Sequence, residues 1–147
     1  MDRLLLALAL AAVVLVIAVV AQRRRPEPPS SSVGFRAPAQ LDRSDFADPD
    51  APWLVAVFTS STCSTCAAVW SKAQVLASDE VAVQQVEAAE QADLHRRYRI
   101  EAVPITVVAD ADGVVRDSFM GPVSATHLWA ALAELRSPGS VPPDCHD

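Results

Sequence analysis

The stretch Trp53-Leu-Val-Ala-Val-Phe-Thr-Ser-Ser-Thr-Cys-Ser-Thr-Cys-Ala-Ala-Val-Trp70 decides the fold, because a short apolar run in it leads into two cysteines. Residues 53–58 have the length and the β-branched and aromatic content of a buried strand. From Cys63 onward the polar and apolar residues follow a helical pattern that ends near Ser78. The sequence therefore predicts a strand followed directly by a helix, with Cys63 and Cys66 in the first turn of that helix.

The two cysteines have the spacing of a reactive pair. Residues i and i+3 of a helix share one face, so the two sulfur atoms lie within reach of a disulfide. The free N–H groups and the positive dipole end of a helix start favour a thiolate at the more exposed Cys63. We therefore predict that Cys63 attacks a substrate disulfide and that Cys66 resolves the mixed disulfide. Ser64 and Thr65, between them, can donate hydrogen bonds toward the thiolate.

Three later sequence motifs follow the cysteine pair along the chain. They are Ala102-Val-Pro-Ile-Thr-Val-Val108, the turn Asp110-Ala-Asp-Gly113, and Phe119-Met-Gly-Pro122 before a last helix. Together with the dithiol, this order and spacing resembles the thioredoxin superfamily over residues 40–136, in particular its membrane-anchored bacterial members. The resemblance implies an α/β fold, a three-layer sandwich with a central mixed β-sheet. It also implies thiol–disulfide exchange through a redox-active disulfide, with no other cofactor and no metal.

The resemblance also implies which residues bind the substrate. Pro104 matches the family's cis-proline beside the dithiol, Val103 before it offers its backbone to an extended substrate, and Gly121 borders the same groove. Several positions depart from the family pattern. Val57 stands where thioredoxins carry a buried Asp that assists proton transfer, and Thr62 replaces the Trp before the first cysteine. The proton relay is therefore expected to be absent, which indicates a specialised reductant more than a general one.

An apolar segment near the start of the chain predicts a membrane anchor. Residues 4–21 contain no charged or polar side chain and span roughly 27 Å as a helix, close to the hydrocarbon thickness of a bilayer. The alternative is a secretion signal with a cleavage site at Val19-Val-Ala21. Arg23-Arg24-Arg25 would then follow almost at once, which is unfavourable for export, so we expect an uncleaved single-pass anchor over residues 1–22 that contacts membrane lipid.

The basic residues beside this segment predict its orientation. Arg3, offset by Asp2, lies on one side and three arginines lie on the other, so the positive-inside rule places the domain on the cytoplasmic side of the cell membrane. The extracytoplasmic side is the alternative, since many membrane-tethered thioredoxin-like proteins of bacteria face outward. Residues 23–38 are rich in Pro and Ser and predict a linker. The globular domain is expected over 39–136 and a mobile tail over 137–147.

Periodicity and turn signals predict the remaining elements. Leu94 and Tyr98 are expected on one helix face, and Leu128, Leu132 and Leu135 are expected to face the sheet. The predicted elements are a short helix over Leu41–Ala47, a strand over Val81–Val86, a helix over Glu90–Tyr98, a hairpin of Ile105–Ala109 and Val114–Phe119, and a helix from N-cap Ser124 to near Arg136.

Charge and cysteine content restrict the function further. The net charge is −6, and residues 37–147 hold 7 Lys or Arg against 16 Asp or Glu. Nucleic-acid binding needs a basic face and is therefore excluded. Expected partners are proteins with disulfides and an upstream dithiol or thioredoxin-system reductant. Three cysteines leave one over, so Cys145 is expected to be free.

Two rival functions use the same residues. In the first, Cys63 and Cys66 bind zinc or copper, with Cys145 or His146 completing the set. In the second, a groove recognises extended peptides without catalysis. His95, next to Arg96 and Arg97, is expected on a solvated helix face and is therefore not a ligand candidate.

Overall fold

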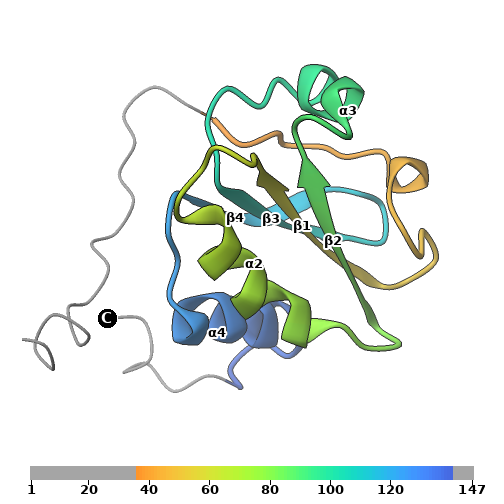
Figure 1. Ribbon diagram of the computed structural model, residues 1–147. Helices are drawn as coiled ribbons and strands as arrows, with labels where there is room; N and C mark the ends of the chain where they lie inside the picture. Colours follow the sequence, from red (N-terminus) through yellow and green to blue (C-terminus); the bar gives the residue numbers. More distant parts are fainter. Residues whose placement is uncertain (1–35, 141–147) are drawn as a thin grey trace, which may run out of the picture.

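A computed structural model describes residues 36–140 of the chain (Figure 1). The predicted anchor, most of the predicted linker and Cys145 lie outside these residues. Within residues 36–140, no helix has the length and apolar character needed to cross a bilayer.

A mixed four-stranded sheet forms the middle layer, in the order β2-β1-β3-β4. β1 (Trp53–Thr59) pairs in parallel with β2 (Val81–Glu87) and antiparallel with β3 (Ile105–Asp110). β3 pairs antiparallel with β4 (Val115–Met120). Every residue of β1 after Trp53 is buried, which explains why its sequence is an almost continuous apolar run. The predicted α/β fold with a central mixed sheet is confirmed.

Alternate residues of β1 serve two separate cores. Val55 and Val57 pack with residues of α2 (Cys66–Ala73) and α4 (Ala125–Arg136). Leu54, Ala56 and Phe58 pack on the opposite face, with Tyr98 after α3 (Ala92–Arg97). Leu41 and Phe46 join the same core from residues 36–52, which precede β1 and are called the first described segment below. Figure 1 shows α2 and α4 together on one side of the sheet, away from α3. The domain therefore has three layers.

The first described segment differs from its prediction. A single 3₁₀ turn, η1 (Arg43–Asp45), replaces the expected helix over residues 41–47. The reason is pairing before that turn: Gln40 forms an isolated antiparallel bridge with Val114, and the Leu41 N–H donates to the Gly113 carbonyl at 2.8 Å. These bonds hold the backbone extended where the amphipathic pattern suggested a helix.

The β3–β4 turn confirms the predicted hairpin and shows why it needs glycine. Gly113 has φ +76°, and a Cβ there would lie 2.0 Å from the Leu41 carbonyl oxygen. The Asp110 carboxylate accepts the N–H groups of Asp112 at 3.0 Å and Val114 at 2.9 Å. The hairpin and the first described segment are thus fitted to each other without room for a side chain at position 113.

The last helix matches its prediction. The Ser124 hydroxyl accepts the His127 N–H at 3.1 Å, which makes Ser124 the N-cap of α4. Leu128 and Leu132 are buried against the sheet and Leu135 packs partly against the same core. α4 thereby closes the layer that also contains α2, whose C-terminal end continues as a 3₁₀ turn, η2 (Gln74–Leu76).

Candidate active site

The two cysteines of the central stretch form a disulfide. Cys63 and Cys66 are joined through their sulfur atoms, with their Cα atoms 5.5 Å apart. Cys66, the first residue of α2, is buried with 3% of its surface exposed, whereas Cys63 is only partly buried. Only the accessible sulfur can meet a bulky substrate first, so the geometry favours Cys63 as the nucleophile and Cys66 as the resolving thiol.

The start of α2 corrects the prediction for Cys63. The helix begins at Cys66, with Thr65 as its N-cap, so Cys63 lies in the preceding loop and not in the first turn. A turn encloses it: the Cys63 N–H donates to the Ser60 carbonyl at 3.0 Å, and the Thr62 N–H donates to the Ser60 hydroxyl at 3.4 Å. Local hydrogen bonds of serine and threonine compete with helix formation, which explains the later helix start.

One hydroxyl lies within reach of the nucleophile. Thr65 Oγ1 is 3.7 Å from Cys63 Sγ, a sulfur hydrogen-bond distance. A thiolate can only accept, so a hydrogen bond between these two groups in the reduced protein requires the Thr65 hydroxyl as the donor. The Thr65 side chain forms no hydrogen bond that caps α2, and its hydroxyl is therefore available for Cys63.

The residues expected to bind substrate also lie together. The Val103–Pro104 peptide bond is cis, as predicted, and Pro104 is buried. The Gly121 N–H donates to the Pro104 carbonyl at 2.7 Å, and Gly121 has φ +84°. β3 begins directly after Pro104, and Ile105 pairs with Phe58 at the end of β1 that leads to the cysteine loop. Their role in substrate binding stays a prediction.

Apolar packing occupies the position where a buried acid assists the resolving thiol in related proteins. Val57 is fully buried and belongs to the core shared with Val69 of α2, one turn after Cys66. Thr62 is exposed beside Cys63. The dithiol is thus bordered by small hydroxyl side chains on the surface and by aliphatic side chains beneath it.

Sequence reasoning missed Glu87, the last residue of β2. Its Oε1 accepts the Ser61 N–H at 2.7 Å, and its Oε2 accepts the Ala89 N–H at 2.6 Å and the Glu90 N–H at 3.2 Å. The hydrogen bond from Ala89, followed by those from Ser61 and Glu90, lowers the pKa of the Glu87 carboxyl. No local pattern in the sequence marks this role, because it depends on the parallel register that places Glu87 beside Thr59.

His95 is packed and not on a solvated face, contrary to the prediction. Its ring meets Phe58 edge-on at a centroid distance of 5.4 Å, and its Nε2 lies 2.9 Å from the Val86 carbonyl oxygen. Because a carbonyl only accepts, Nε2 donates this bond. The ring therefore joins α3 to the end of β2.

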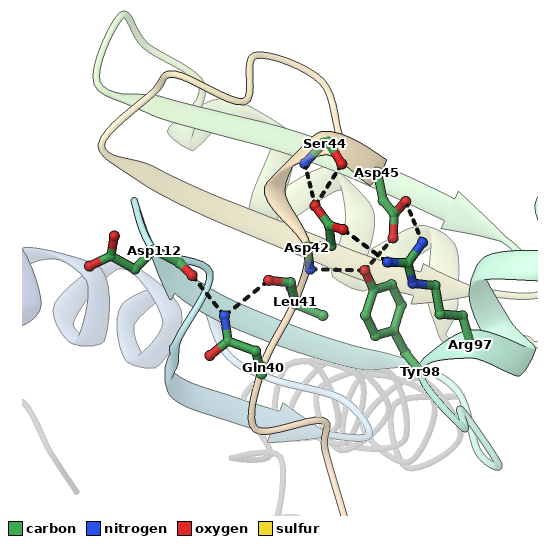
Figure 2. A network of polar contacts seen from close by, with 8 residues as sticks. All are labelled: Gln40, Leu41, Asp42, Ser44, Asp45, Arg97, Tyr98 and Asp112. Carbon is green, nitrogen blue, oxygen red and sulfur yellow. Dashed lines mark hydrogen bonds and ion pairs between the residues drawn. The ribbon is translucent and has the colours of Figure 1, made fainter.

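A polar network joins the first described segment to the end of α3 (Figure 2). Arg97 forms ion pairs with the carboxylates of Asp42 at 2.9 Å and Asp45 at 3.0 Å, although 53% of its side chain stays exposed. The Tyr98 hydroxyl accepts the Asp42 N–H at 3.0 Å and donates to the Asp45 carboxylate. Burial, followed by the bond to Asp45, raises the pKa of Tyr98 to about 12. Gln40 adds a bond to the Asp112 carbonyl at 2.7 Å.

The metal alternative has little support in the described part of the chain. Residues 36–140 contain no group of three or more His, Cys, Asp or Glu side chains placed to hold a metal ion. Cys145 and His146, the other expected ligands, lie outside those residues.

A family model described as Thioredoxin matches residues 41–134. No curated protein matches the chain. The matched segment includes the disulfide, the cis-proline and the packed core of the three layers.

Solved structures share the fold at low sequence identity. A mutant thioredoxin from Halobacterium salinarum is 23% identical, with a TM-score of 0.54 over 74% of this chain and 100% of that one. The germline-specific thioredoxin Deadhead from Drosophila melanogaster is 23% identical, with a TM-score of 0.51 over 59% and 84% of the two chains. A thioredoxin from Fasciola hepatica is 24% identical, with a TM-score of 0.50 over 58% and 83%. These structures are similar in fold.

Proposed function

Because the chain belongs to the thioredoxin family, we propose that it is a membrane-tethered thiol–disulfide oxidoreductase that reduces or exchanges disulfides in protein or small-thiol substrates. The observation that carries the proposal is the Cys63–Cys66 disulfide at the start of α2, with one accessible and one buried sulfur. The chemistry uses this disulfide itself and needs no further cofactor.

The reductive reaction takes two displacement steps. In the reduced protein the Cys63 thiolate attacks one sulfur of the substrate disulfide, and the other substrate sulfur leaves as a thiolate. Cys66 then loses its proton and attacks Cys63 Sγ in the mixed disulfide, which releases the second substrate sulfur. Two electrons pass to the substrate, and the protein is left with its disulfide. An upstream dithiol, such as that of a thioredoxin system, reverses this oxidation.

The surroundings of Cys66 bear on the second step. Val57 offers no carboxylate, so the proton of Cys66 passes to water or to the leaving substrate thiolate. A positioned acid–base group typically contributes about 100-fold or more to the step that it serves. We therefore propose a slower resolving step than in thioredoxins with a buried Asp, suited to a restricted set of substrates.

Substrate binding is proposed at the Pro104 edge. The backbone of Val103 pairs with an extended substrate segment, and Gly121, hydrogen-bonded to Pro104, forms the neighbouring wall. Thr62 leaves more room beside Cys63 than the tryptophan of ordinary thioredoxins. Support comes from the hydrogen bond between Gly121 and Pro104 and from the register of β3 against β1.

Membrane tethering rests on the sequence of residues 4–21. We propose a single-pass anchor of the type found in bacterial thioredoxin-like proteins, with the linker 23–38 holding the domain away from the membrane, on the cytoplasmic side. Carbonate extraction should leave the full-length chain in the membrane pellet. Protease added to sealed cells should spare the domain, whereas degradation would place it outside.

The decisive test of the function is the reduction potential of the Cys63–Cys66 pair. The full-length chain is equilibrated in glutathione and dithiothreitol buffers, and intact mass after alkylation gives the oxidised fraction. A value near that of thioredoxin, roughly −270 mV, supports a reductant fed by the thioredoxin system. A value near about −120 mV indicates a disulfide-forming oxidant and favours the outward-facing alternative. Absence of a disulfide in every buffer refutes the proposed function.

A further inference from the structure

The loop that carries Cys63 is joined to a second loop by one carboxylate. Glu87 ends β2, and the parallel register places it beside Thr59, the last residue of β1. Glu87 Oε1 accepts the Ser61 N–H at 2.7 Å, inside the loop between β1 and α2. Since Ser61 precedes Cys63 by two positions, this bond acts close to the nucleophile.

The second oxygen of the same carboxylate holds the connection from β2 to α3. Glu87 Oε2 accepts the N–H groups of Ala89 at 2.6 Å and Glu90 at 3.2 Å. A glutamine at this position would have one accepting oxygen in place of two and could not reproduce both sets of bonds. An ionised acceptor makes the stronger kind of hydrogen bond, so the carboxylate is suited to this position.

The other hydrogen bonds around Cys63 act within its own turn. The Cys63 N–H donates to the Ser60 carbonyl at 3.0 Å, and the Thr62 N–H donates to the Ser60 hydroxyl at 3.4 Å. These bonds give the turn its shape but do not fix it relative to β2. The bond between Glu87 and Ser61 does so, next to the backbone bond from the Ala88 N–H to the Thr59 carbonyl at 2.9 Å.

We propose that Glu87 is a positioning residue for the dithiol: it fixes the loop of Cys63 against the β2–α3 connection, so that Cys63 stays within reach of Cys66. The inference rests on the proposed exchange function. Holding two reacting groups in register raises their effective concentration. Without the carboxylate the loop samples more positions, Cys66 meets Cys63 less often, and the intramolecular disulfide becomes easier to reduce.

The test compares Glu87→Ala with Glu90→Ala in the full-length chain, purified in mild detergent. Both changes remove one negative charge from the β2–α3 connection. Glu90 contributes only its backbone N–H to the bonds of the Glu87 carboxylate, and its side chain is exposed, so Glu90→Ala keeps those bonds. In glutathione redox buffers, the equilibrium constant for disulfide formation should fall about three- to tenfold in Glu87→Ala. It should stay within about twofold of the parent in Glu90→Ala. Deuterium uptake in the peptide that contains Ser61 and Cys63 should rise in Glu87→Ala alone.

A second variant keeps the test decisive if Glu87→Ala loses its fold. Glu87→Gln retains one accepting oxygen and should give values between those of the parent and Glu87→Ala. Equal equilibrium constants and equal deuterium uptake in the parent, Glu87→Gln and Glu90→Ala would overturn the inference. So would an equal loss in Glu90→Ala, because charge alone would then explain the effect. If the unmodified chain forms no disulfide in these buffers, the proposed function itself is refuted. That result needs no variant and is therefore distinct from a failure of the inference about Glu87.

Discussion

The hydroxyl of Thr65 should set the reactivity of the nucleophile. Thr65 Oγ1 lies 3.7 Å from Cys63 Sγ and has no capping hydrogen bond to α2, so Thr65→Val removes the donor while keeping the shape of the side chain and the helix start. The change therefore isolates one hydrogen bond to the thiolate.

The size of the effect follows from that bond. A hydrogen bond to a charged group contributes about 1.5–3 kcal/mol in favourable geometry. The bond from Thr65 to Cys63 is weaker, about 1 kcal/mol, because its acceptor is a sulfur atom that is partly exposed to solvent. Loss of this hydrogen bond from the thiolate state raises the pKa of the Cys63 thiol, and about 1 kcal/mol corresponds to a factor of about five in the thiolate equilibrium. Below that pKa the thiolate fraction, and with it the alkylation rate, should fall about fivefold.

The assay is the pH dependence of iodoacetamide alkylation of the reduced chain, followed by mass. Ser64→Ala is the matched control, because it removes the other hydroxyl between the cysteines. We expect a shifted profile for Thr65→Val and an unshifted one for Ser64→Ala. Superimposable profiles for the parent and Thr65→Val would refute the assignment of Thr65 as a donor, and a shift in Ser64→Ala alone would move that role to Ser64.

Three further predictions concern the dithiol, the hairpin and the tyrosine. Cys63→Ser should abolish insulin reduction, whereas Cys66→Ser should accumulate mixed disulfides visible on non-reducing gels; full activity in both variants would contradict the mechanism. Gly113→Ala should lower the free energy of unfolding in urea by about 2–4 kcal/mol, because the new Cβ meets the Leu41 carbonyl. Gly139→Ala, also at positive φ but with open space around it, should cost about 1 kcal/mol, and equal losses would argue against the clash. Folding raises the pKa of Tyr98 from 10.0 to about 12, so the free energy of unfolding should fall as pH rises from 10 to 12; Tyr98→Phe should remove this fall, and an unchanged slope would disprove its source.

Local signals made most of the fold predictable. The apolar run of β1, the Asp and Gly residues of the hairpin turn and Ser124 at the start of α4 each act within a few residues, so their structures follow from the sequence around them. The disulfide matches what the spacing of the cysteine pair predicted, and the cis bond before Pro104 matches what the resemblance to the thioredoxin superfamily implied.

The late start of α2 has a local cause, but three other errors share one physical cause, which is contact with residues far away in the chain. Gln40 is held extended by Val114 of the hairpin, so the expected helix after it is reduced to one turn. His95 looks solvated beside two arginines, but Phe58 and the Val86 carbonyl bury one side of its ring. Glu87 reaches Ser61 only because β1 and β2 pair in a particular register, which no local pattern specifies.

The attachment of the first described segment has a mechanical consequence. Tension on a tether at residues 4–21 would enter the domain near residue 36 and reach the strand bridge at Gln40 first, followed by the ion pairs of Asp42 and Asp45 with Arg97. The bridge ties this segment to the β3–β4 hairpin, and the ion pairs tie it to the end of α3, so these contacts would carry the load. A pull on such a tether would therefore first load contacts that do not include the loop of Cys63.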